Sequence, residues 1–333
     1  MSWNLDSLLA LATAQRASDL HLHAGLTPRV RVHGKLHALD ASEPLTDEHL
    51  RHMLCDYLDA TQQTYFVQGQ EVDFAFSVPK LGRFRGNAFA HQHGCGAVLR
   101  HIPNHTPTLT ELHAPAVVTE LLQRTGLLLV TGPTGSGKST TLAAMVRHLN
   151  THSAQHIVTL EDPIEFVHPS QHCLVTQREM GTHSQGFAQA LRAALREDPD
   201  VILVGELRDL DTIRLALTAA ETGHLVLASL HTRSAASTVE RMVDVFDAQE
   251  KNLVRTQLSE ALIGVLSQTL YPTPERDGRH AVFETLVVTP AIRHLIREGK
   301  TAQMQSAIQT GASHGMQTLE QALQQARDQG QIA

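Results

Sequence analysis

Cysteine and aromatic residues are scarce in this sequence. Three cysteines scattered over 333 residues cannot form a disulfide framework or a four-cysteine zinc site, which favours the cytoplasm. Aromatic residues make up 4% and the formal net charge is −7, so a nucleic-acid-binding surface is not expected. No apolar run approaches the roughly 18 residues needed to span a bilayer, and residues 1–6 lack the basic start of a signal peptide. These absences predict a cytoplasmic globular protein that neither inserts into a membrane nor binds nucleic acid.

The length and the change of pattern along the chain predict two domains. Residues 1–102 predict a small α+β domain, because stretches such as 72–78 alternate like a strand with one buried face. Residues 103–115 carry three prolines among polar residues and predict a linker. In residues 116–333, apolar runs alternate with helical stretches, which predicts a mostly parallel α/β sheet.

The stretch from Gly132 to Ser139 matches G-x-x-x-x-G-K-[ST], the pattern of a loop that wraps nucleotide phosphates. It follows a predicted strand and precedes a predicted helix, whose N-terminus favours an anionic phosphate. Lys138 would reach the β- and γ-phosphates, and Ser139 would hold magnesium. The predicted nucleotide-binding residues are Gly132, Pro133, Thr134, Gly135, Ser136, Gly137, Lys138, Ser139 and Thr140.

Polar clusters follow each of four predicted strands, at residues 127–131, 157–160, 201–204 and 225–230. In doubly wound sheets, ligands bind at the carboxyl ends of the strands, so these clusters point to one shared site. The clusters are the phosphate loop, Glu161-Asp162, Glu206 and His231.

Carboxylates at two of these strand ends predict the chemistry of the site. Glu206 lies where a magnesium-linked acid is expected; the usual residue is aspartate, and the longer glutamate favours contact through water. The alternative is a surface ion pair of Glu206 with Arg208 or Arg196. Glu165 is predicted to orient the attacking water, with Asp162 helping to hold water or magnesium, although Asp162 could instead cap a turn.

Two histidines, His224 and His231, bracket the strand 225–230. A lone histidine at a strand end is more often structural than catalytic. His231 is the better placed of the two, because it lies at the carboxyl end, where a neutral imidazole could sense the γ-phosphate.

Arginines of the N-terminal domain are candidates for charge compensation. Arg83 and Arg85 share one face of a strand, and Arg100 lies on its neighbour. No arginine is evident beside the phosphate loop itself, so we expect Arg83 and Arg100 to be supplied by the N-terminal domain of a neighbouring subunit, as an arginine finger in trans.

Taken together, these motifs resemble the secretion and pilus motor ATPases, and specifically the retraction ATPases of type IV pili. The resemblance covers nearly the whole chain and is carried by the phosphate loop (residues 132–140), an acidic box (159–168), a signature ending in Val-Gly-Glu-Leu-Arg-Asp (195–209), a histidine box (222–232), and the segments 17–22, 291–298 and 315–319.

The resemblance implies a PAS-like N-terminal domain, a RecA-like P-loop ATPase domain and a homohexameric ring that uses ATP and Mg²⁺. It implies Glu165 as the catalytic glutamate, Glu206 as an atypical Walker B acid, and His224 and His231 near the nucleotide. Segments 291–298 and 315–319 resemble the retraction subfamily. Extension and type II secretion ATPases usually carry a longer N-terminal region, and many have a four-cysteine zinc module.

The function expected from this resemblance is a Mg-ATP-hydrolysing motor for type IV pilus retraction, acting on an inner-membrane platform protein from the cytoplasmic side. An accessory retraction, competence or type II secretion assembly ATPase is the alternative. A RecA-like nucleic-acid translocase is a distant one, disfavoured by the acidic net charge. The intact Lys138, Ser139, Glu165 and Glu206 disfavour a regulator that binds nucleotide without hydrolysing it.

Overall fold

The computed structural model describes residues 3–32, 34–39, 43–102, 105–275 and 278–332, and divides the chain into two compact units, residues 1–105 and 106–333. Residues 103 and 104 of the predicted linker lie outside the described residues. The rest of that segment belongs mainly to the second unit, where Leu109 is part of the core. Among the described residues, no helix is both long and apolar enough to cross a membrane.

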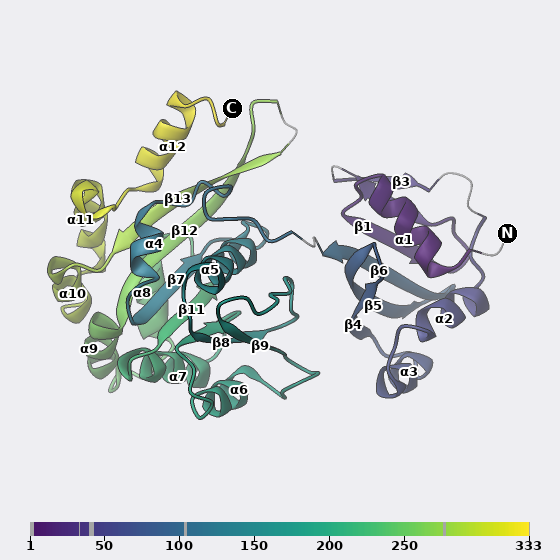
Figure 1. The fold of residues 1–333 in the computed structure, drawn as a ribbon, viewed down its shortest axis with the longest axis horizontal. Coiled ribbons are helices and arrows are strands. Elements are labelled where there is room, and N and C mark those ends of the chain that lie inside the picture. Colours follow the sequence, from purple (N-terminus) through teal and green to yellow (C-terminus); the bar gives the residue numbers. More distant parts are fainter. Residues whose placement is uncertain (1–2, 33, 40–42, 103–104, 276–277, 333) are drawn as a thin grey trace. The chain divides into compact units, whose positions relative to one another are not determined.

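The first unit is an antiparallel sheet with helices packed on one face (Figure 1). Its six strands lie in the order β3-β2-β1-β6-β5-β4. Apolar residues of all three helices join the inward residues of the sheet in one core. The elements are α1 (Leu5–Ala14), β1 (Asp19–His23), β2 (Arg29–Val32), β3 (Lys35–Ala38), α2 (Asp47–Cys55), α3 (Ala60–Val67), β4 (Val72–Val78), β5 (Gly82–His91) and β6 (Gly94–Ile102).

The second unit is a seven-stranded sheet in the order β13-β12-β7-β11-β10-β8-β9, parallel except for the edge strand β13. The strands are β7 (Gly126–Thr131), β8 (His156–Glu161), β9 (Leu174–Glu179), β10 (Val201–Val204), β11 (Leu225–Leu230), β12 (Leu262–Pro272) and β13 (Arg279–Val287). The helices are α4 (Val117–Leu121), α5 (Lys138–His152), α6 (Phe187–Ala194), α7 (Leu210–Glu221), α8 (Ala235–Asp244), α9 (Lys251–Ala261), α10 (Pro290–Arg297), α11 (Met304–Thr310) and α12 (Leu319–Asp328).

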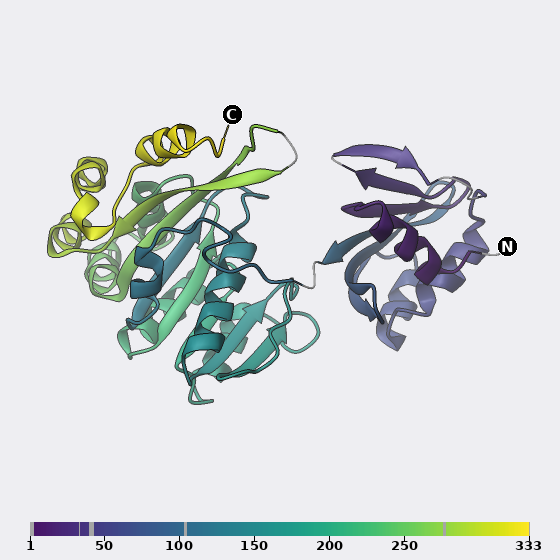
Figure 2. The same cartoon turned by 45° about the horizontal axis from the view of Figure 1, so that its top comes forward.

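The strand order explains where the helices lie (Figure 2). The chain moves one way along the sheet from β7 to β8, and the other way from β9 to β10 and from β10 to β11. Because such crossovers are right-handed, α5 lies on one face, whereas α6 and α7 lie on the other and contact each other. The four predicted strands are confirmed, and their registers bring the carboxyl ends of β7, β8, β10 and β11 to one edge.

Candidate functional site

The phosphate loop connects β7 to α5, as the sequence predicted, and its glycines allow a tight backbone. Gly132 has φ +145, and a Cβ there would lie 2.3 Å from the carbonyl oxygen of Gln268. Gly137, at φ +88, is the N-cap of α5, which begins at Lys138. Any side chain at Gly132 would strain the backbone and displace β12. Ser139 is exposed and Thr140 partly buried in the first turn of α5, where N–H groups favour an anion.

Strand β12 packs against the phosphate loop and the first turns of α5. Gln268 is 2% exposed, and its side-chain oxygen accepts a hydrogen bond from Thr141 of α5 at 2.7 Å. The Thr131 hydroxyl lies 2.8 Å from that of Ser267. Ser136 is buried, and its hydroxyl has no hydrogen-bond partner in the described part of the chain. A buried hydroxyl without a partner is costly, so Ser136 fits a loop built to surround a polar ligand.

Lys138 lies at the centre of the site. Its ammonium donates to the carbonyl oxygens of Gly132 at 2.9 Å and Pro133 at 3.1 Å, and lies 3.4 Å from Nδ1 of His231. Burial lowers the pKa of Lys138, and the negative charges of Glu206 and Glu165 oppose that shift. The two predicted catalytic glutamates therefore act electrostatically on the lysine of the phosphate loop.

Glu206 follows β10 and is 19% exposed in its side chain. One carboxylate oxygen lies 3.1 Å from Nε2 of His231, and the other accepts from Nε of Arg208 at 2.8 Å. Arg208 also lies 4.0 Å from the carboxylate of Asp162. The sequence left open whether Glu206 pairs with Arg208 or belongs to the nucleotide site. In the structure Glu206 contacts both Arg208 and His231.

Arg208 is linked to the phosphate loop through Glu206 and His231. It connects Glu206 and Asp162, Glu206 contacts His231, and His231 contacts Lys138. None of these contacts joins Arg208 to the loop itself, so the expectation of an arginine supplied in trans stays a prediction.

Glu165 lies in the irregular segment that follows β8, between Ile164 and Phe166, which are 5% and 8% exposed. Its side chain is partly buried, and its charge raises the pKa of both Lys138 and Glu161. Contacts thus join Lys138, His231 and Glu206, with Asp162 linked through Arg208, whereas Glu165 acts on Lys138 through its charge. The role of each in catalysis stays a prediction.

His224 does not join this cluster within the chain. It precedes β11, whereas His231 follows it, and a strand of six residues spans about 20 Å. Its Nδ1 lies 2.8 Å from the carbonyl oxygen of Ala219, near the end of α7. The two histidines therefore lie at opposite ends of β11. This arrangement does not support a role for His224 at the nucleotide.

Arg83 and Arg100 belong to the first unit, on the sheet face opposite its helices. Asp19 is 5% exposed and receives a hydrogen bond from Nε of Arg100 at 2.8 Å. Arg85 lies 3.9 Å from Asp73. Arg100 therefore has a structural contact within its own unit, and its proposed action in trans stays a prediction, as does that of Arg83.

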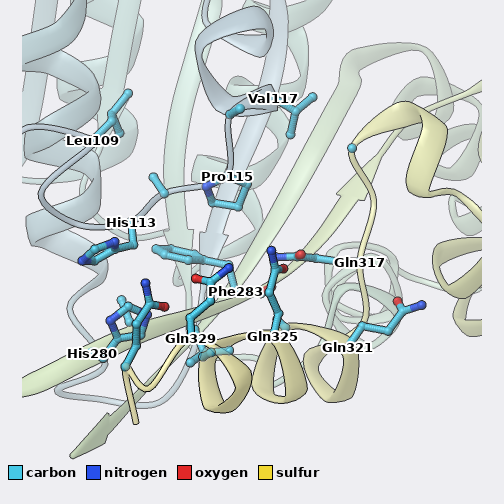
Figure 3. Close-up of a pocket in the computed structure, with 18 of the residues that line it drawn as sticks. Leu109, His113, Pro115, Val117, His280, Phe283, Gln317, Gln321, Gln325 and Gln329 are labelled. Atoms are coloured by element: carbon cyan, nitrogen blue, oxygen red, sulfur yellow. The ribbon is translucent and has the colours of Figure 1, made fainter. Parts of the chain in front are cut away.

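A groove of about 880 Å³ lies elsewhere in the second unit (Figure 3). Its walls are the segment 109–119, β13 and the side of α12 that presents Gln321, Gln325 and Gln329. None of the predicted site residues lines it. The groove therefore has no part in the predicted nucleotide site.

Comparison with known proteins agrees with this geometry. The family described as type II/IV secretion system protein matches residues 3–332. The chain belongs to this family. In Escherichia coli (strain K12), the uncharacterized protein YggR is 52% identical over 330 residues, 99% of this chain and 100% of that protein. In Pseudomonas aeruginosa, the type IV pilus retractation ATPase PilT is 54% identical over 321 residues, 96% of this chain and 93% of that protein.

A solved structure matches the fold closely. The crystal structure of the pilus retraction motor PilT with bound ADP has a TM-score of 0.93 and 42% identity, over 99% of this chain and 95% of that one. The fold class is confirmed: a small N-terminal domain built on an antiparallel sheet, and a P-loop ATPase domain with a mixed sheet. The membership of the secretion and pilus ATPases expected from the motifs is also confirmed.

Proposed function

We propose that this protein is a motor ATPase that powers retraction of a type IV pilus. The observation that carries the proposal is the contact of His231 with both the phosphate-loop lysine and Glu206, which links the nucleotide site across β7, β11 and β10. Identity of 54% to the Pseudomonas aeruginosa type IV pilus retractation ATPase and of 49% to a twitching motility protein of Neisseria gonorrhoeae, each over almost the whole chain, supports the assignment to pilus motors.

ATP is the proposed substrate, and the phosphate loop is where its phosphates fit. The backbone allowed by Gly132, Gly135 and Gly137 exposes N–H groups at the start of α5, and the buried hydroxyl of Ser136 is unpartnered among the described residues. The ADP in the PilT structure supports a nucleotide at this loop. The hydroxyl of Ser139 and the carboxylate of Glu206 would hold Mg²⁺, which neutralises phosphate charge when bound.

Hydrolysis requires a group that orients water and removes its proton. Glu165 supplies the carboxylate we propose for this role, and its negative charge, like that of Glu206, opposes the lowering of the Lys138 pKa by burial. Lys138 supplies a donor for the charge that develops on the transferred phosphoryl group, and His231 contacts both Lys138 and Glu206. Arg83 and Arg100 of a neighbouring subunit complete the site in a homohexamer.

The mechanical partner we propose is the platform protein of the pilus machine at the cytoplasmic face of the inner membrane. The retraction function of PilT supports this choice. The Pseudomonas aeruginosa type IV pilus ATPase PilU, 40% identical over 98% of this chain, supports a pilus motor in general.

Changing Glu165 to glutamine tests the hydrolytic site. Glu165→Gln should bind ATP with an affinity close to that of the unchanged protein and release phosphate about 10²–10⁴ times more slowly, because an amide cannot accept the water proton. Glu320→Gln, at an exposed position in α12, is the matched control and should keep full turnover. Normal turnover of Glu165→Gln would remove Glu165 from its proposed role.

Pilus counts test the direction of the motor. Deleting the gene should leave cells with excess pili that do not retract. Loss of all pili would instead identify an assembly motor. Pili that still retract, but with a lower force or rate, would identify an accessory ATPase. In each case, phosphate release by the purified protein reports the ATPase activity independently of the pilus.

A further inference from the structure

The segment that carries Glu165 has no regular secondary structure of its own. Between the end of β8 at Glu161 and the start of β9 at Leu174, the described chain contains no helix and no strand. A loop of this kind has no ladder of backbone hydrogen bonds to fix it, so its position depends on side chains around it. Such contacts come from β9, the edge strand of the sheet.

Gln177 of β9 makes three hydrogen bonds that cross to this segment and to β8. Its side-chain NH₂ donates to the carbonyl oxygen of Phe166 at 2.8 Å and to a carboxylate oxygen of Glu161 at 3.1 Å. Its side-chain oxygen accepts from the backbone N–H of His168 at 2.7 Å. One amide therefore holds the backbone at two points just after Glu165.

Glu179, two residues further along β9, holds the other side of Glu165. Its carboxylate accepts from the backbone N–H of Ile164 at 3.1 Å. Residues two apart on a strand share a face, so Gln177 and Glu179 present their polar groups to the same segment. Ile164 and Phe166, the two neighbours of Glu165, also have buried side chains. They are therefore held by packing as well as by hydrogen bonds to β9.

Glu161, the last residue of β8, contacts the side chain of Gln177. The Glu161 carboxylate also accepts a hydrogen bond from the hydroxyl of Thr159 at 2.7 Å. Burial raises the pKa of Glu161, and the hydrogen bonds from Thr159 and Gln177 oppose that shift. Main-chain groups of Ile164, Phe166 and His168, on both sides of Glu165, are thus each bound by a side chain of β9.

We propose that Gln177 and Glu179 are positioning residues that hold Glu165 at the distance from the phosphate loop that hydrolysis requires. The proposal rests on the proposed function, because it assigns to β9 the placement of the catalytic glutamate. Displacement of a reacting group by about 1 Å can cost on the order of 100-fold in rate. Loss of the three Gln177 hydrogen bonds should therefore lower turnover without changing the phosphate loop.

The opposite face of β9 offers a matched control. Arg178 lies between the two positioning residues, but its guanidinium contacts Glu197 at 2.6 Å, just beyond α6. Arg178→Ala removes an ion pair from the same strand while leaving the contacts to residues 164–168 in place. A general weakening of β9 would affect Gln177 and Arg178 variants alike, whereas positioning of Glu165 would affect only the former.

The test measures phosphate release, nucleotide affinity and backbone exchange on the full chain. In Gln177→Leu, kcat should fall roughly 10- to 100-fold, while the dissociation constant of a fluorescent ATP analogue stays within about twofold of the unchanged value. Arg178→Ala should keep kcat within about threefold. A Gln177→Leu protein with unchanged kcat, or an equal loss in Arg178→Ala, would overturn the proposal.

A charged variant adds a pH readout that a structural role would not move. Gln177→Glu keeps the acceptor for the N–H of His168 but loses both donors and places a carboxylate beside that of Glu161. Two close carboxylates share a proton, so the new acid is neutral at lower pH and can then donate again. The ratio of its kcat to that of the unchanged protein should rise as the pH falls from 8 to 6. A ratio that stays flat would contradict the assignment.

Two further measurements separate this proposal from the proposed function. If Gln177 acts through Glu165, adding Gln177→Leu to Glu165→Gln should cause no further loss of turnover; a full additional loss would overturn the proposal. Hydrogen exchange of the Ile164 and His168 amides needs no turnover. These amides should exchange slowly in the unchanged protein and faster in Gln177→Leu, and equal rates would overturn the positioning role even if the protein proved not to be a motor.

Discussion

Nε2 of His231 lies 3.1 Å from a carboxylate oxygen of Glu206, and the other ring nitrogen lies 3.4 Å from the ammonium of Lys138. Because an ammonium can only donate, Nδ1 accepts from Lys138 and the ring proton resides on Nε2, facing Glu206. The ring therefore joins Lys138, predicted to reach the phosphates, to Glu206, proposed to hold magnesium. A change in either contact is transmitted to the other through one rigid side chain.

Removing this ring should slow hydrolysis more than it weakens binding. In His231→Ala, Glu206 loses one of two neighbouring donors, and hydrogen bonds to charged groups are worth about 1.5–3 kcal/mol. That range corresponds to a fall in kcat of about 10- to 100-fold. Steady-state phosphate release and equilibrium binding of a fluorescent ATP analogue measure the two quantities separately, and binding should change by less than about threefold.

His224→Ala is the control on the same strand. His224 lies at the opposite end of β11 and its ring nitrogen faces the carbonyl oxygen of Ala219, so its loss should affect stability rather than kcat. An equal loss of kcat in both variants would show that the cluster within one chain does not explain the role of these histidines.

The fold of the second unit was largely predictable because its signals are local. Strands β7, β8, β10 and β11 are short apolar runs, and in β7, β10 and β11 every residue is buried. The rule that ligands bind at the carboxyl ends of such strands then predicted which polar residues would meet. The order of the strands was not predictable in this way, because it depends on pairings between residues far apart in the sequence.

The contacts of Arg208 and Gln177 could not be read from the sequence in the same way. Arg208 connects Glu206 with Asp162 through a long side chain whose direction is set by tertiary packing. Gln177 lies on β9, a strand with no fully buried residue and therefore no apolar alternation to mark its faces. Polar side chains that fix a loop produce little periodicity in the sequence, because hydrogen bonds depend on the direction of the groups rather than on residue type.

Arginines of the first unit give a prediction about the assembled ring. Arg83→Ala should bind ATP normally and lose about 10³–10⁵ in turnover if its guanidinium is supplied to a neighbour. Arg85→Ala, on the same face of β5 and 3.9 Å from Asp73, is the control and should keep turnover within about threefold. Normal turnover of both Arg83→Ala and Arg100→Ala would reject a trans finger from this strand pair.

Arg100 needs a separate control because it also pairs with the buried Asp19. Asp19→Asn removes this pair while keeping the arginine, so it should lower the melting temperature but not the turnover, whereas Arg100→Ala should lower both. Mixing Arg83→Ala subunits with Lys138→Ala subunits adds a direct test of the trans geometry. Only donation between subunits would restore phosphate release in the mixed ring.

Acid sensitivity of the second unit should depend on His168, whose backbone N–H donates to Gln177. Burial lowers the pKa of His168 from 6.5 to about 4, and the side chain is 9% exposed. Because the folded state binds its proton less readily than the unfolded state, this histidine costs nothing above pH 6.5 and destabilises the fold progressively as the pH falls from 6.5 towards 4.

At pH 5, the effect of His168 amounts to about 2 kcal/mol of unfolding free energy, since each pKa unit corresponds to about 1.4 kcal/mol. His168→Phe cannot be protonated, so between pH 7 and pH 5 it should lose about 2 kcal/mol less stability than the unchanged protein. Other histidines with lowered pKa values, such as His148 and His280, titrate in both proteins and cancel in the comparison. Urea unfolding followed by circular dichroism at the two pH values measures the difference, and equal losses would show that His168 gains its proton without opening the fold.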